Sequence, residues 1–343
     1  GRPFKFLDEF GMSKGFAVIG YGGTNSEGRL HADALNSTPG LNLVGFYDVD
    51  PSRVKQAQVD FPSAKGYNSL EDLIADEQVY GAVVVTPHST HRDIVVRLLE
   101  GGKAVVCEKP MAITAKEADD MIDASRRAGV PFTVFQNRRW DGDYLTVKSV
   151  VESGVLGPVF LYESTVEGYG EPRGWRRERR FGGGMLYDWG AHLIDQALQL
   201  VRERLLSAYA KMDVGGVWNV DVDTHSLVLM NFEHTHFVVE TGSIEAVQKP
   251  RWRVLGEKGG LQAEWDKARI ALRGRGVSVD GEVKMIKGDW MDFYRQLSRA
   301  LNEGGQLPVR PEESRDAIAV IEAAFESART GEPVKPALLR DSA

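Results

Sequence analysis

One short segment in the first half of the chain carries a lysine in a position suited to chemistry. Residues 104–110 read AVVCEKP, an apolar run typical of a strand buried on both faces, and it ends in Glu108 and Lys109. Open α/β sheets bind ligands at the carboxyl ends of their strands, which is where this lysine would lie. The alternative is an ordinary solvated lysine in a strand-to-helix turn, and the rest of the chain must decide between the two.

A second segment, residues 182–195 (GGGMLYDWGAHLID), holds the densest set of polar groups in the latter half. If the glycine run opens a helix, then Asp188, His192 and Asp195 recur at i, i+4 and i+7 and share one face. Such groups are costly to bury without partners, and a histidine with carboxylates on its own face is a good general acid or base. A structural hydrogen-bond network is one alternative. A metal site is another, although no further His or Cys cluster supports it.

A glycine-rich turn follows the first predicted strand. Residues 20–28 read GYGGTNSEG, in which Gly20 and Gly22 fit the dinucleotide-binding fingerprint and the third glycine is displaced to Gly28. The backbone of this turn and the helix that follows would receive a pyrophosphate. The cofactor contacts predicted here are Gly20, Tyr21, Gly22, Gly23, Thr24 and Asn25.

Asp48 ends the second predicted strand and bears on the choice of cofactor. Counted from Gly28, it lies at the usual interval of about 20 residues, so the loop is expected to be lengthened before the glycine that packs the helix. Asp48 would accept hydrogen bonds from both adenosine ribose hydroxyls and repel a 2′-phosphate, which favours NAD over NADP. A simple turn carboxylate is the alternative, and nearby Arg53 leaves NADP possible.

The elements that must position these residues alternate between strand and helix over the first part of the chain. Short apolar runs separated by amphipathic stretches predict a parallel sheet covered by helices, the α/β doubly wound Rossmann architecture. The predicted strands are 16–20, 43–48, 81–87, 104–110 and 131–137. Helices are expected to begin at Pro51 with Asp50 as N-cap, at Ser69, near Ser89, and at Thr114 with Glu117 as its capping-box partner.

After Asn137 the pattern changes to two-residue alternation, which predicts an α+β domain with a large, mainly antiparallel open sheet. A helix over about 143–153 precedes it, and helices over 290–302 and 312–330 close the chain. The predicted strand segments are 159–169, 224–233, 235–243, 251–259, 260–265 and 268–274. We therefore expect an NAD(P)-binding domain over 1–137 and a substrate-binding and oligomerisation domain over 138–343. Within the first domain, residues 1–11 are interpreted as a remnant of cloning or a processed extension and do not enter the reasoning on the fold.

The composition bounds the class of protein. The chain has 343 residues, 42% of them apolar and 27% charged, with a formal net charge of −7. These values predict a soluble globular protein with no basic footprint for nucleic acid and no apolar run long enough for a membrane, although residues 173–180 (RGWRRERR) are locally cationic. The single cysteine, Cys107, and the lack of a secretory signal favour the cytoplasm. Four histidines have no catalytic company in the sequence and are interpreted as surface or core: His31, His225, His234 and His236.

Taken in order, the motifs resemble the Gfo/Idh/MocA oxidoreductase family, from Gly15 to about Pro336. They are the glycine-rich turn, Thr86-Pro87 followed by His91, Glu108-Lys109-Pro110, Asn137-Arg138-Arg139-Trp140 after Gln136, Trp175-Arg176, and the segment from the glycine run to Asp195. In that family the lysine after the glutamate is catalytic, and the D-x-x-x-H pair supplies substrate contacts and the acid-base histidine. The resemblance carries these roles onto Lys109, Asp188 and His192.

The activity that the resemblance implies is hydride transfer between nicotinamide and a secondary carbinol or ketone carbon of a sugar, cyclitol or sugar derivative. His192 would take the hydroxyl proton, Lys109 would stabilise the alkoxide and Asp188 would orient a substrate hydroxyl. The further cofactor contacts implied are Thr86, Pro87, His91, Glu108 and Asn137. The further substrate contacts implied are Arg138, Trp175 and Arg176. An alternative role for Trp175 and Arg176 is to close over the cofactor, and a second alternative for Trp175 is core packing.

Two other functions fit the same fold. A non-catalytic, dinucleotide-sensing regulator is one, although such proteins commonly lose the lysine or the histidine that this chain keeps. A glycosidase that uses bound NAD for transient oxidation is the other. In every case a homo-oligomer, a dimer or tetramer, is expected through the C-terminal sheet, because large apolar faces rarely stay bare.

Overall fold

The computed structural model describes residues 13–22 and 26–340, which fall into two compact units. Unit 1 comprises the described residues up to Met111, together with Lys116–Phe135 and Met291–Pro311. Unit 2 comprises Ala112–Ala115, Gln136–Trp290 and the described residues from Glu312 onward. The segment 291–311, late in the sequence, is thus part of unit 1.

Among the described residues, unit 1 is built on a six-stranded parallel sheet in the order β3-β2-β1-β4-β5-β6. Its strands are Lys14–Ile19 (β1), Leu41–Tyr47 (β2), Lys65–Gly66 (β3), Gly81–Val84 (β4), Ala104–Cys107 (β5) and Phe132–Val134 (β6). Every residue of β4 and β5 is buried, as expected for apolar runs covered on both faces. The predicted doubly wound sheet is confirmed, and only the two-residue β3 is too short for the pattern to have indicated it.

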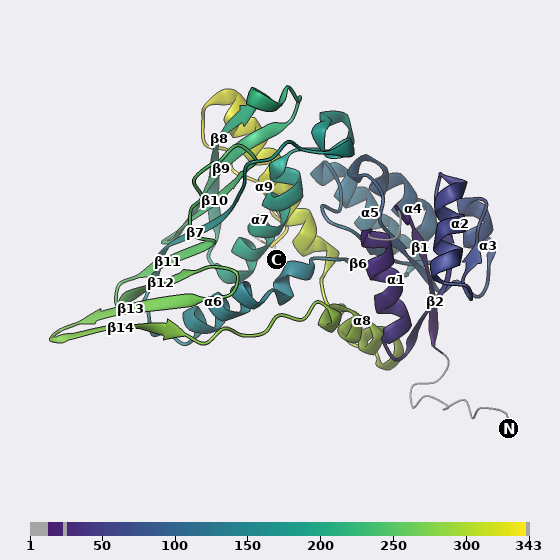
Figure 1. The fold of residues 1–343 in the computed structure, drawn as a ribbon, viewed down its shortest axis with the longest axis horizontal. Coiled ribbons are helices and arrows are strands. Elements are labelled where there is room, and N and C mark those ends of the chain that lie inside the picture. Colours follow the sequence, from purple (N-terminus) through teal and green to yellow (C-terminus); the bar gives the residue numbers. More distant parts are fainter. Residues whose placement is uncertain (1–12, 23–25, 341–343) are drawn as a thin grey trace. The chain divides into compact units, whose positions relative to one another are not determined.

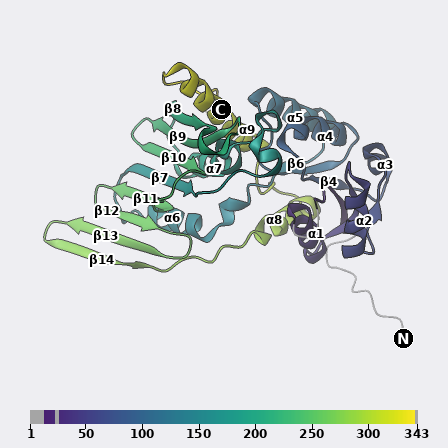
Figure 2. The ribbon, with the colours of Figure 1, turned by 45° about the horizontal axis from the view of Figure 1, so that its top comes forward.

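Helices cover both sides of this sheet, with α4 and α5 on one side and α1 and α8 on the other (Figure 2). They are Glu27–Ser37 (α1), Pro51–Asp60 (α2), Leu70–Ala75 (α3), His91–Glu100 (α4), Ala115–Ala128 (α5) and Met291–Glu303 (α8). Side chains cap the first three: Ser26 accepts from the Arg29 amide, and Asp50 and Ser69 act in the same way as predicted. A 3-10 turn, His88–Thr90 (η1), precedes α4.

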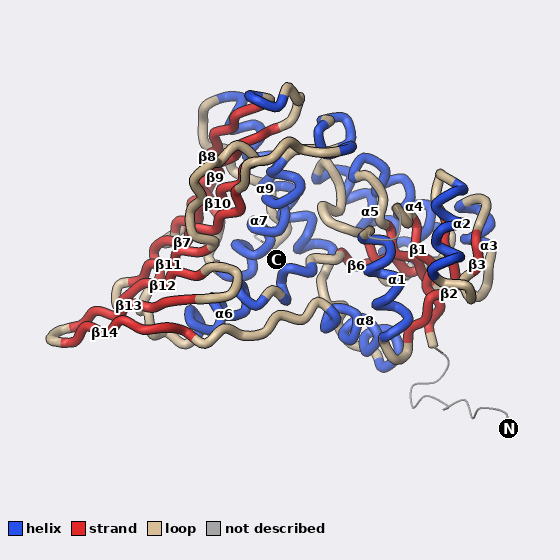
Figure 3. Tube along the Cα trace, in the orientation of Figure 1, coloured by secondary structure: helices blue, strands red, loops and turns tan. Residues whose placement is uncertain are grey.

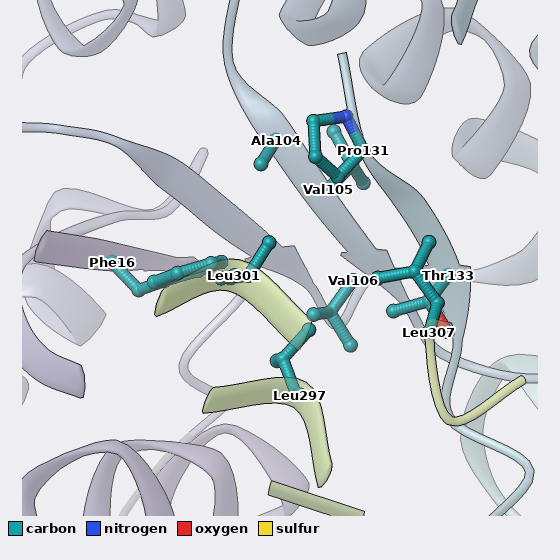
Figure 4. Close-up of a pocket in the computed structure, with 9 residues that line it drawn as sticks. All are labelled: Phe16, Ala104, Val105, Val106, Pro131, Thr133, Leu297, Leu301 and Leu307. Atoms are coloured by element: carbon teal, nitrogen blue, oxygen red, sulfur yellow. The ribbon is translucent and has the colours of Figure 1, made fainter. Parts of the chain in front are cut away.

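Helix α8 packs on the sheet of unit 1 through leucines. Leu297 and Leu301 lie against Phe16 and Val106 in a narrow apolar gap that Leu307 also lines (Figure 4). Leu297 is buried, and the Ser298 hydroxyl donates to the carbonyl of Pro39 at 2.6 Å. Apolar burial therefore fixes α8, which comes late in the sequence, to the parallel sheet of unit 1.

In the part of the chain that the structure describes, unit 2 has an eight-stranded sheet in the order β14-β13-β12-β11-β7-β10-β9-β8. Its strands are Val159–Glu167 (β7), Leu205–Val214 (β8), Asp223–Phe232 (β9), His236–Gly242 (β10), Trp252–Gly256 (β11), Gly259–Ala263 (β12), Ala268–Gly274 (β13) and Val277–Val283 (β14). Adjacent strands are antiparallel except the parallel pair β7 and β10. The predicted mainly antiparallel sheet is confirmed, whereas β8 and β14 were not predicted.

The helices of unit 2 lie on one side of its sheet, as Figures 1 and 3 show for α6, α7 and α9. These helices are Gly142–Glu152 (α6), Ala191–Leu200 (α7) and Pro311–Thr330 (α9), with a π-helical turn Leu186–Gly190 (η5) leading into α7. Short 3-10 turns are Asn137–Trp140 (η2), Gly174–Arg177 (η3), Arg179–Phe181 (η4) and Gly216–Trp218 (η6). Among the described residues, α6, α7 and α9 do not lie on the opposite face (Figures 1 and 3), and β14 is exposed along nearly its whole length.

Candidate active site

The carboxyl ends of neighbouring strands in unit 1 lie in one row. The strand register pairs Ile19 with Tyr47 and Val84, and pairs Cys107 with Val84 and Val134. Ligands bind at this edge of open α/β sheets. The row gathers groups that are far apart in sequence, because the next residue along each strand is Asp48, Gly20, Val85, Glu108 or Phe135.

The glycine turn after β1 makes two close backbone approaches. Gly20 has a φ of +91°, and a Cβ there would lie 2.1 Å from the Val85 carbonyl oxygen. A Cβ on Gly28, in the first turn of α1, would lie 2.6 Å from the carbonyl oxygens of both Gly20 and Tyr21. Since real Cβ atoms essentially never approach within 3.0 Å, Gly28 has the helix-packing role expected of the third fingerprint glycine. The predicted contacts Gly23, Thr24 and Asn25 lie outside the described residues.

Asp48 accepts two backbone hydrogen bonds directly after β2. The amides of Tyr21 and Asp50 donate at 2.9 Å, one to each carboxylate oxygen. Each oxygen has about two acceptor sites, so both keep capacity for a ribose hydroxyl. Arg53 lies at the same turn, where its Nη1 donates to the Gly22 carbonyl at 3.0 Å and its side chain is 48% exposed. A carboxylate and a cation are therefore both present where the adenosine ribose would bind.

The side chain of Tyr21 points into unit 1. It is fully buried, packs edge-on against Phe46 and is hydrogen-bonded through its hydroxyl to Asp60. Burial and the bond to Asp60 raise the pKa of Tyr21 to about 12. A cofactor contact from this residue would therefore come from its backbone.

The turn after β4 is tied to the segment after β5 by His91. Thr90 Oγ1 lies 2.7 Å from both Thr86 Oγ1 and the Pro87 carbonyl oxygen, and its single proton can serve one of them at a time. His91 is fully buried, and its ring nitrogens lie 2.9 Å from the carbonyl oxygens of Thr86 and Pro110. Burial lowers the pKa of His91, although both carbonyls act in the opposite sense. The ring thus faces protein backbone on both of its polar edges.

Glu108 and Lys109 follow β5 directly. Glu108 Oε1 lies 2.9 Å from His31 Nε2, and Oε2 accepts from the Lys109 amide at 3.0 Å. The other ring nitrogen of His31 is hydrogen-bonded to the Tyr294 hydroxyl of α8. Burial by itself raises the pKa of Glu108, but the His31 bond and the charges of His31 and Lys109 bring it below its usual value. His31 lies in the core, one of the two interpretations given, and its hydrogen-bond partners come from distant parts of the sequence.

His225 in unit 2 also has partners that the sequence did not reveal. Its Nε2 lies 3.1 Å from Glu240 Oε1, and its Nδ1 lies 3.3 Å from Asp213 Oδ2. Burial lowers the pKa of His225, but these carboxylates and Glu245 raise it above its ordinary value. The other two histidines, His234 and His236, are exposed as interpreted.

The second predicted segment starts with a π-helical turn rather than a uniform α-helix. Asp223 Oδ2 accepts from the Leu186 amide at 2.7 Å at the start of this turn. A Cβ on Gly184, whose φ is +103°, would lie 2.0 Å from the other oxygen of Asp223. Because a π-helical turn holds more residues than an α-helical turn, Asp188 is rotated relative to His192 from the predicted placement.

Predicted substrate contacts meet around Asp188. Asp188 Oδ2 lies 3.3 Å from Arg176 Nε, and the Arg176 guanidinium lies over the ring of Trp175, 4.6 Å from its centroid. His192 is 5% exposed, and the centroid of its ring lies 5.9 Å from that of Trp189. Unit 2 therefore holds a carboxylate, a guanidinium and an indole ring in mutual contact, and a second indole ring beside its candidate acid-base histidine.

Asp195, the third member of the predicted stripe, serves as an anchor. Arg139 donates to both of its oxygens, at 2.8 and 2.6 Å, and to Glu313 Oε2 at 2.8 Å. Burial by itself lowers the pKa of Arg139, but these two carboxylates raise it above its usual range. Asp195 is 1% exposed, so the alternative interpretation, a structural network, fits this residue. The network joins α7, which carries His192, to η2 and α9.

Arg138 lies beside Trp189 in unit 2. Its guanidinium carbon is 4.1 Å from the ring centroid of Trp189 and 5.5 Å from that of Trp290, and its Nη1 donates to Asp141 at 2.8 Å. Cation–π contacts of this kind fix a guanidinium in place. Asn137, predicted to contact the cofactor, is buried at the start of η2.

Within residues 13–22 and 26–340, no group of three or more His, Cys, Asp or Glu side chains is arranged to hold a metal ion. In the same ranges, no helix has the length and apolar character needed to cross a bilayer.

Comparison with known families and structures covers nearly the whole chain. Residues 14–136 match the model of an oxidoreductase family with an NAD-binding Rossmann fold, and residues 144–262 match the GFO/IDH/MocA C-terminal domain. A relative is the scyllo-inositol 2-dehydrogenase (NADP(+)) IolW of Bacillus subtilis, 28% identical over 91% of this chain and 93% of that protein. Another is the inositol 2-dehydrogenase of Rubrobacter xylanophilus, 26% identical over 93% of this chain and 92% of its own length.

Solved structures agree with this match. The crystal structure of an NAD-binding protein from Listeria innocua superposes with a TM-score of 0.86 at 30% identity, covering 95% of this chain and 97% of that one. The fold, the order of the motifs and both domain models point the same way. The chain belongs to the GFO/IDH/MocA oxidoreductase family and carries its NAD-binding Rossmann domain.

Proposed function

We propose that this protein is an NAD(P)-dependent dehydrogenase or reductase acting on a secondary alcohol or ketone carbon of a sugar, a cyclitol or a derivative of either. The observation that carries the proposal is the row at the carboxyl edge of unit 1. There Glu108, followed by Lys109, lies in register with the glycine turn and Asp48. A lysine on the same strand edge as a dinucleotide turn, separated from it by one strand, is suited to act on an oxygen of the molecule that exchanges hydride.

The chain's residues fit a nicotinamide dinucleotide. A Cβ would fill the close approaches at Gly20 and Gly28, and Asp48 retains acceptor capacity for ribose hydroxyls. NAD is the favoured cofactor on this ground. Arg53, within reach of the same turn, would receive a 2′-phosphate and makes NADP possible, as the name of the B. subtilis relative states for that protein.

The bound nicotinamide would accept or return the hydride, and the acid-base work falls to the chain. His192 would take the proton of the substrate hydroxyl during oxidation, because a histidine near neutral pH suits that transfer. Lys109 would stabilise the negative charge that develops on the same oxygen. Asp188 would accept a hydrogen bond from a neighbouring hydroxyl and so orient the ring.

Polyhydroxylated rings suit the groups around Asp188. The guanidinium of Arg176 and the carboxylate of Asp188 are a donor and an acceptor side by side, which matches vicinal hydroxyls. Trp175 offers an apolar face for the C–H side of a ring. Arg138 is a further donor, and the inositol dehydrogenases among the relatives act on substrates of this class by their names.

We further propose that His91, Glu108 and Asn137 support the cofactor site through backbone positioning as much as by direct contact. His91 fits this role because its ring bonds two carbonyls. Thr86 and Pro87 remain the proposed direct contacts on this turn.

The face of the unit 2 sheet opposite to α6, α7 and α9 is proposed as the contact with a second copy of the chain, and the cytoplasm as the compartment. Val277 and Val279 are 60% and 47% exposed on β14, and apolar side chains of this kind favour burial between subunits. The fully buried Cys107 is compatible with a reducing compartment. Light scattering coupled to size exclusion would return a multiple of the 37.9 kDa chain, and a monomer would contradict the proposed assembly.

A screen of sugars and cyclitols tests the activity. Thermal shifts with NAD or NADP present would identify ligands, and reduced-nicotinamide absorbance would then measure turnover of each ligand. We expect growth of that absorbance with at least one cyclitol or sugar. Tight cofactor binding without turnover of any polyol would favour a dinucleotide sensor, and release of sugar from an aryl glycoside without net cofactor reduction would favour a glycosidase.

A further inference from the structure

Three side chains from distant parts of the sequence form a buried chain of hydrogen bonds behind Lys109. Tyr294 on α8 bonds His31 on α1, and His31 bonds Glu108 at the end of β5. His31 is fully buried and Tyr294 is 1% exposed. All three belong to unit 1. Nothing in the proposed chemistry requires Tyr294 or His31 to touch the substrate, so the cost of burying them needs another explanation.

One arrangement of protons satisfies every member of this chain. With a proton on His31 Nε2, the ring donates to the Glu108 carboxylate, and Nδ1 lies within hydrogen-bond reach of the Tyr294 hydroxyl. The second oxygen of Glu108 accepts from the Lys109 amide. Each member of this chain of hydrogen bonds then has a partner among the others or in the Lys109 amide.

The surroundings of His31 are apolar. The ring of His31 lies edge-on to Phe135 with centroids 4.6 Å apart, and Phe135 in turn packs against Phe293. Phe135 and Phe293 are both buried. An apolar enclosure strengthens the hydrogen bond between the imidazole and the carboxylate of Glu108.

We propose that Tyr294 and His31 are positioning residues that keep the Glu108 carboxylate ionised and fixed on the Lys109 amide, so that the proposed catalytic lysine is presented from a rigid strand end. The inference rests on the proposed function for the role of Lys109. Helix α8 also has a role in this proposal, because its Tyr294 is the outer member of the hydrogen-bonded chain Tyr294–His31–Glu108, here called the relay.

The titratable groups around the Glu108 carboxylate come from each helix and strand packed against it. They are His31 on α1, Tyr294 on α8, His91 on α4, Cys107 at the end of β5 and Lys109 beside it. Burial raises the pKa of Glu108, and only His31 and Lys109 lower it. Removing the His31 ring therefore leaves burial less opposed, so the carboxyl group would bind a proton at higher pH.

Two variants test the relay at graded strength. His31→Leu removes both hydrogen bonds in a side chain of similar bulk, and Tyr294→Phe removes only the outer hydroxyl. We expect His31→Leu to move the acid limb of the kcat profile for ketone reduction, the direction in which protonated His192 is the active form, upward by about one pH unit, a tenfold change in proton binding. Tyr294→Phe is expected to move it less in the same direction. Tyr162→Phe, at a buried tyrosine stacked on Phe237 in unit 2, is the matched control and should leave the limb in place.

A second readout does not depend on turnover. Infrared difference titration, with Glu108→Gln as the reference, reports the protonated Glu108 carboxyl directly in the folded protein. We expect no such band in the wild type near about pH 5 and its appearance in His31→Leu at that pH. Circular dichroism on the same samples establishes that each variant is folded, and His31→Gln, which keeps an N–H donor, should restore the wild-type titration if His31→Leu unfolds.

The outcomes separate the relay from the proposed function. An unchanged infrared titration in His31→Leu, or in His31→Ala if the leucine variant does not fold, would overturn the relay whatever the enzyme turns over. A wild type that oxidises no polyol but shows the expected infrared shift would overturn the proposed function and leave the relay as the support of Glu108.

Discussion

Replacing Asp195 with asparagine separates an anchoring role from a catalytic one. Asp195 shares a helix with His192, and its spacing in the sequence suggested a place on one polar stripe. In the structure it is bonded through both oxygens to Arg139. The substitution keeps the volume and removes the charge, so Arg139 retains only Glu313 as an ionic partner.

The expected cost follows from burial. Asp195 and Arg139 have side chains 2% and 11% exposed, and removing one partner of a buried pair costs about 3–5 kcal/mol. Because Glu313 still neutralises Arg139, we expect the lower end, about 3 kcal/mol. In a domain of about 150–250 residues each kcal/mol lowers Tm by about 2–4 °C, so the Tm of unit 2 should fall by about 6–12 °C.

Differential scanning calorimetry measures this shift, with Asp280→Asn as the control. Asp280 pairs with Arg273 at 2.9 Å on the exposed β13–β14 hairpin of the same unit, where both side chains are more than half exposed. Solvent screening should keep its Tm within about 2 °C of the wild type. An Asp195→Asn protein with the Tm of that control and a collapsed kcat would refute the anchor and return Asp195 to the catalytic machinery.

Three further predictions concern the cofactor turn and pH. Gly28→Ala forces a Cβ to 2.6 Å from two carbonyl oxygens, so NADH fluorescence titration should give a Kd weaker by about tenfold. The control Gly274→Ala, whose Cβ would meet nothing within 4 Å, should bind NADH normally. Equal NADH affinities of the two variants would contradict the helix-packing role of Gly28. Arg53→Ala should weaken NADP binding more than NAD binding, and an equal loss for both would remove the guanidinium from the 2′-phosphate site. The raised pKa of His225 adds stability that is complete below about pH 6.5 and is lost as pH rises through the pKa of His225 in the folded protein. His225→Gln should therefore flatten the dependence of Tm on pH in that window. An unchanged dependence would show that the bond from His225 to Glu240 is not the source of this stability.

Local patterns were sufficient for most of the fold. The apolar runs at β4 and β5 and the caps Asp50 and Ser69 are signals carried by adjacent residues, so the strands and helix starts followed from them. Strand β14 was not predicted because its side chains are almost all exposed and do not alternate between buried and exposed positions. Strand β3, with two residues, is below the length at which a period can be read.

The site was predictable where chemistry lies within one motif and not where it depends on tertiary partners. Gly28 and Asp48 followed from spacing alone, and the structure gives each a physical reason. The pairing of His31 with Glu108 joins residues 77 positions apart, and no sequence period relates them. The same holds for Arg139 and Asp195, which the sequence placed in two different motifs.

Lys109→Met tests the central claim most directly, measured as nicotinamide reduction in a single turnover with the best polyol from the screen and as NADH affinity on the same sample. We predict that the hydride-transfer rate falls by at least about a hundredfold, because the stabilisation of a developing alkoxide is lost. The Kd for NADH should stay within about threefold of wild type, because the dinucleotide turn is intact. Lys116→Met, at an exposed lysine of the same unit, should change neither value. A Lys109→Met enzyme that transfers hydride at the wild-type rate would contradict the role given to this lysine and the function built on it.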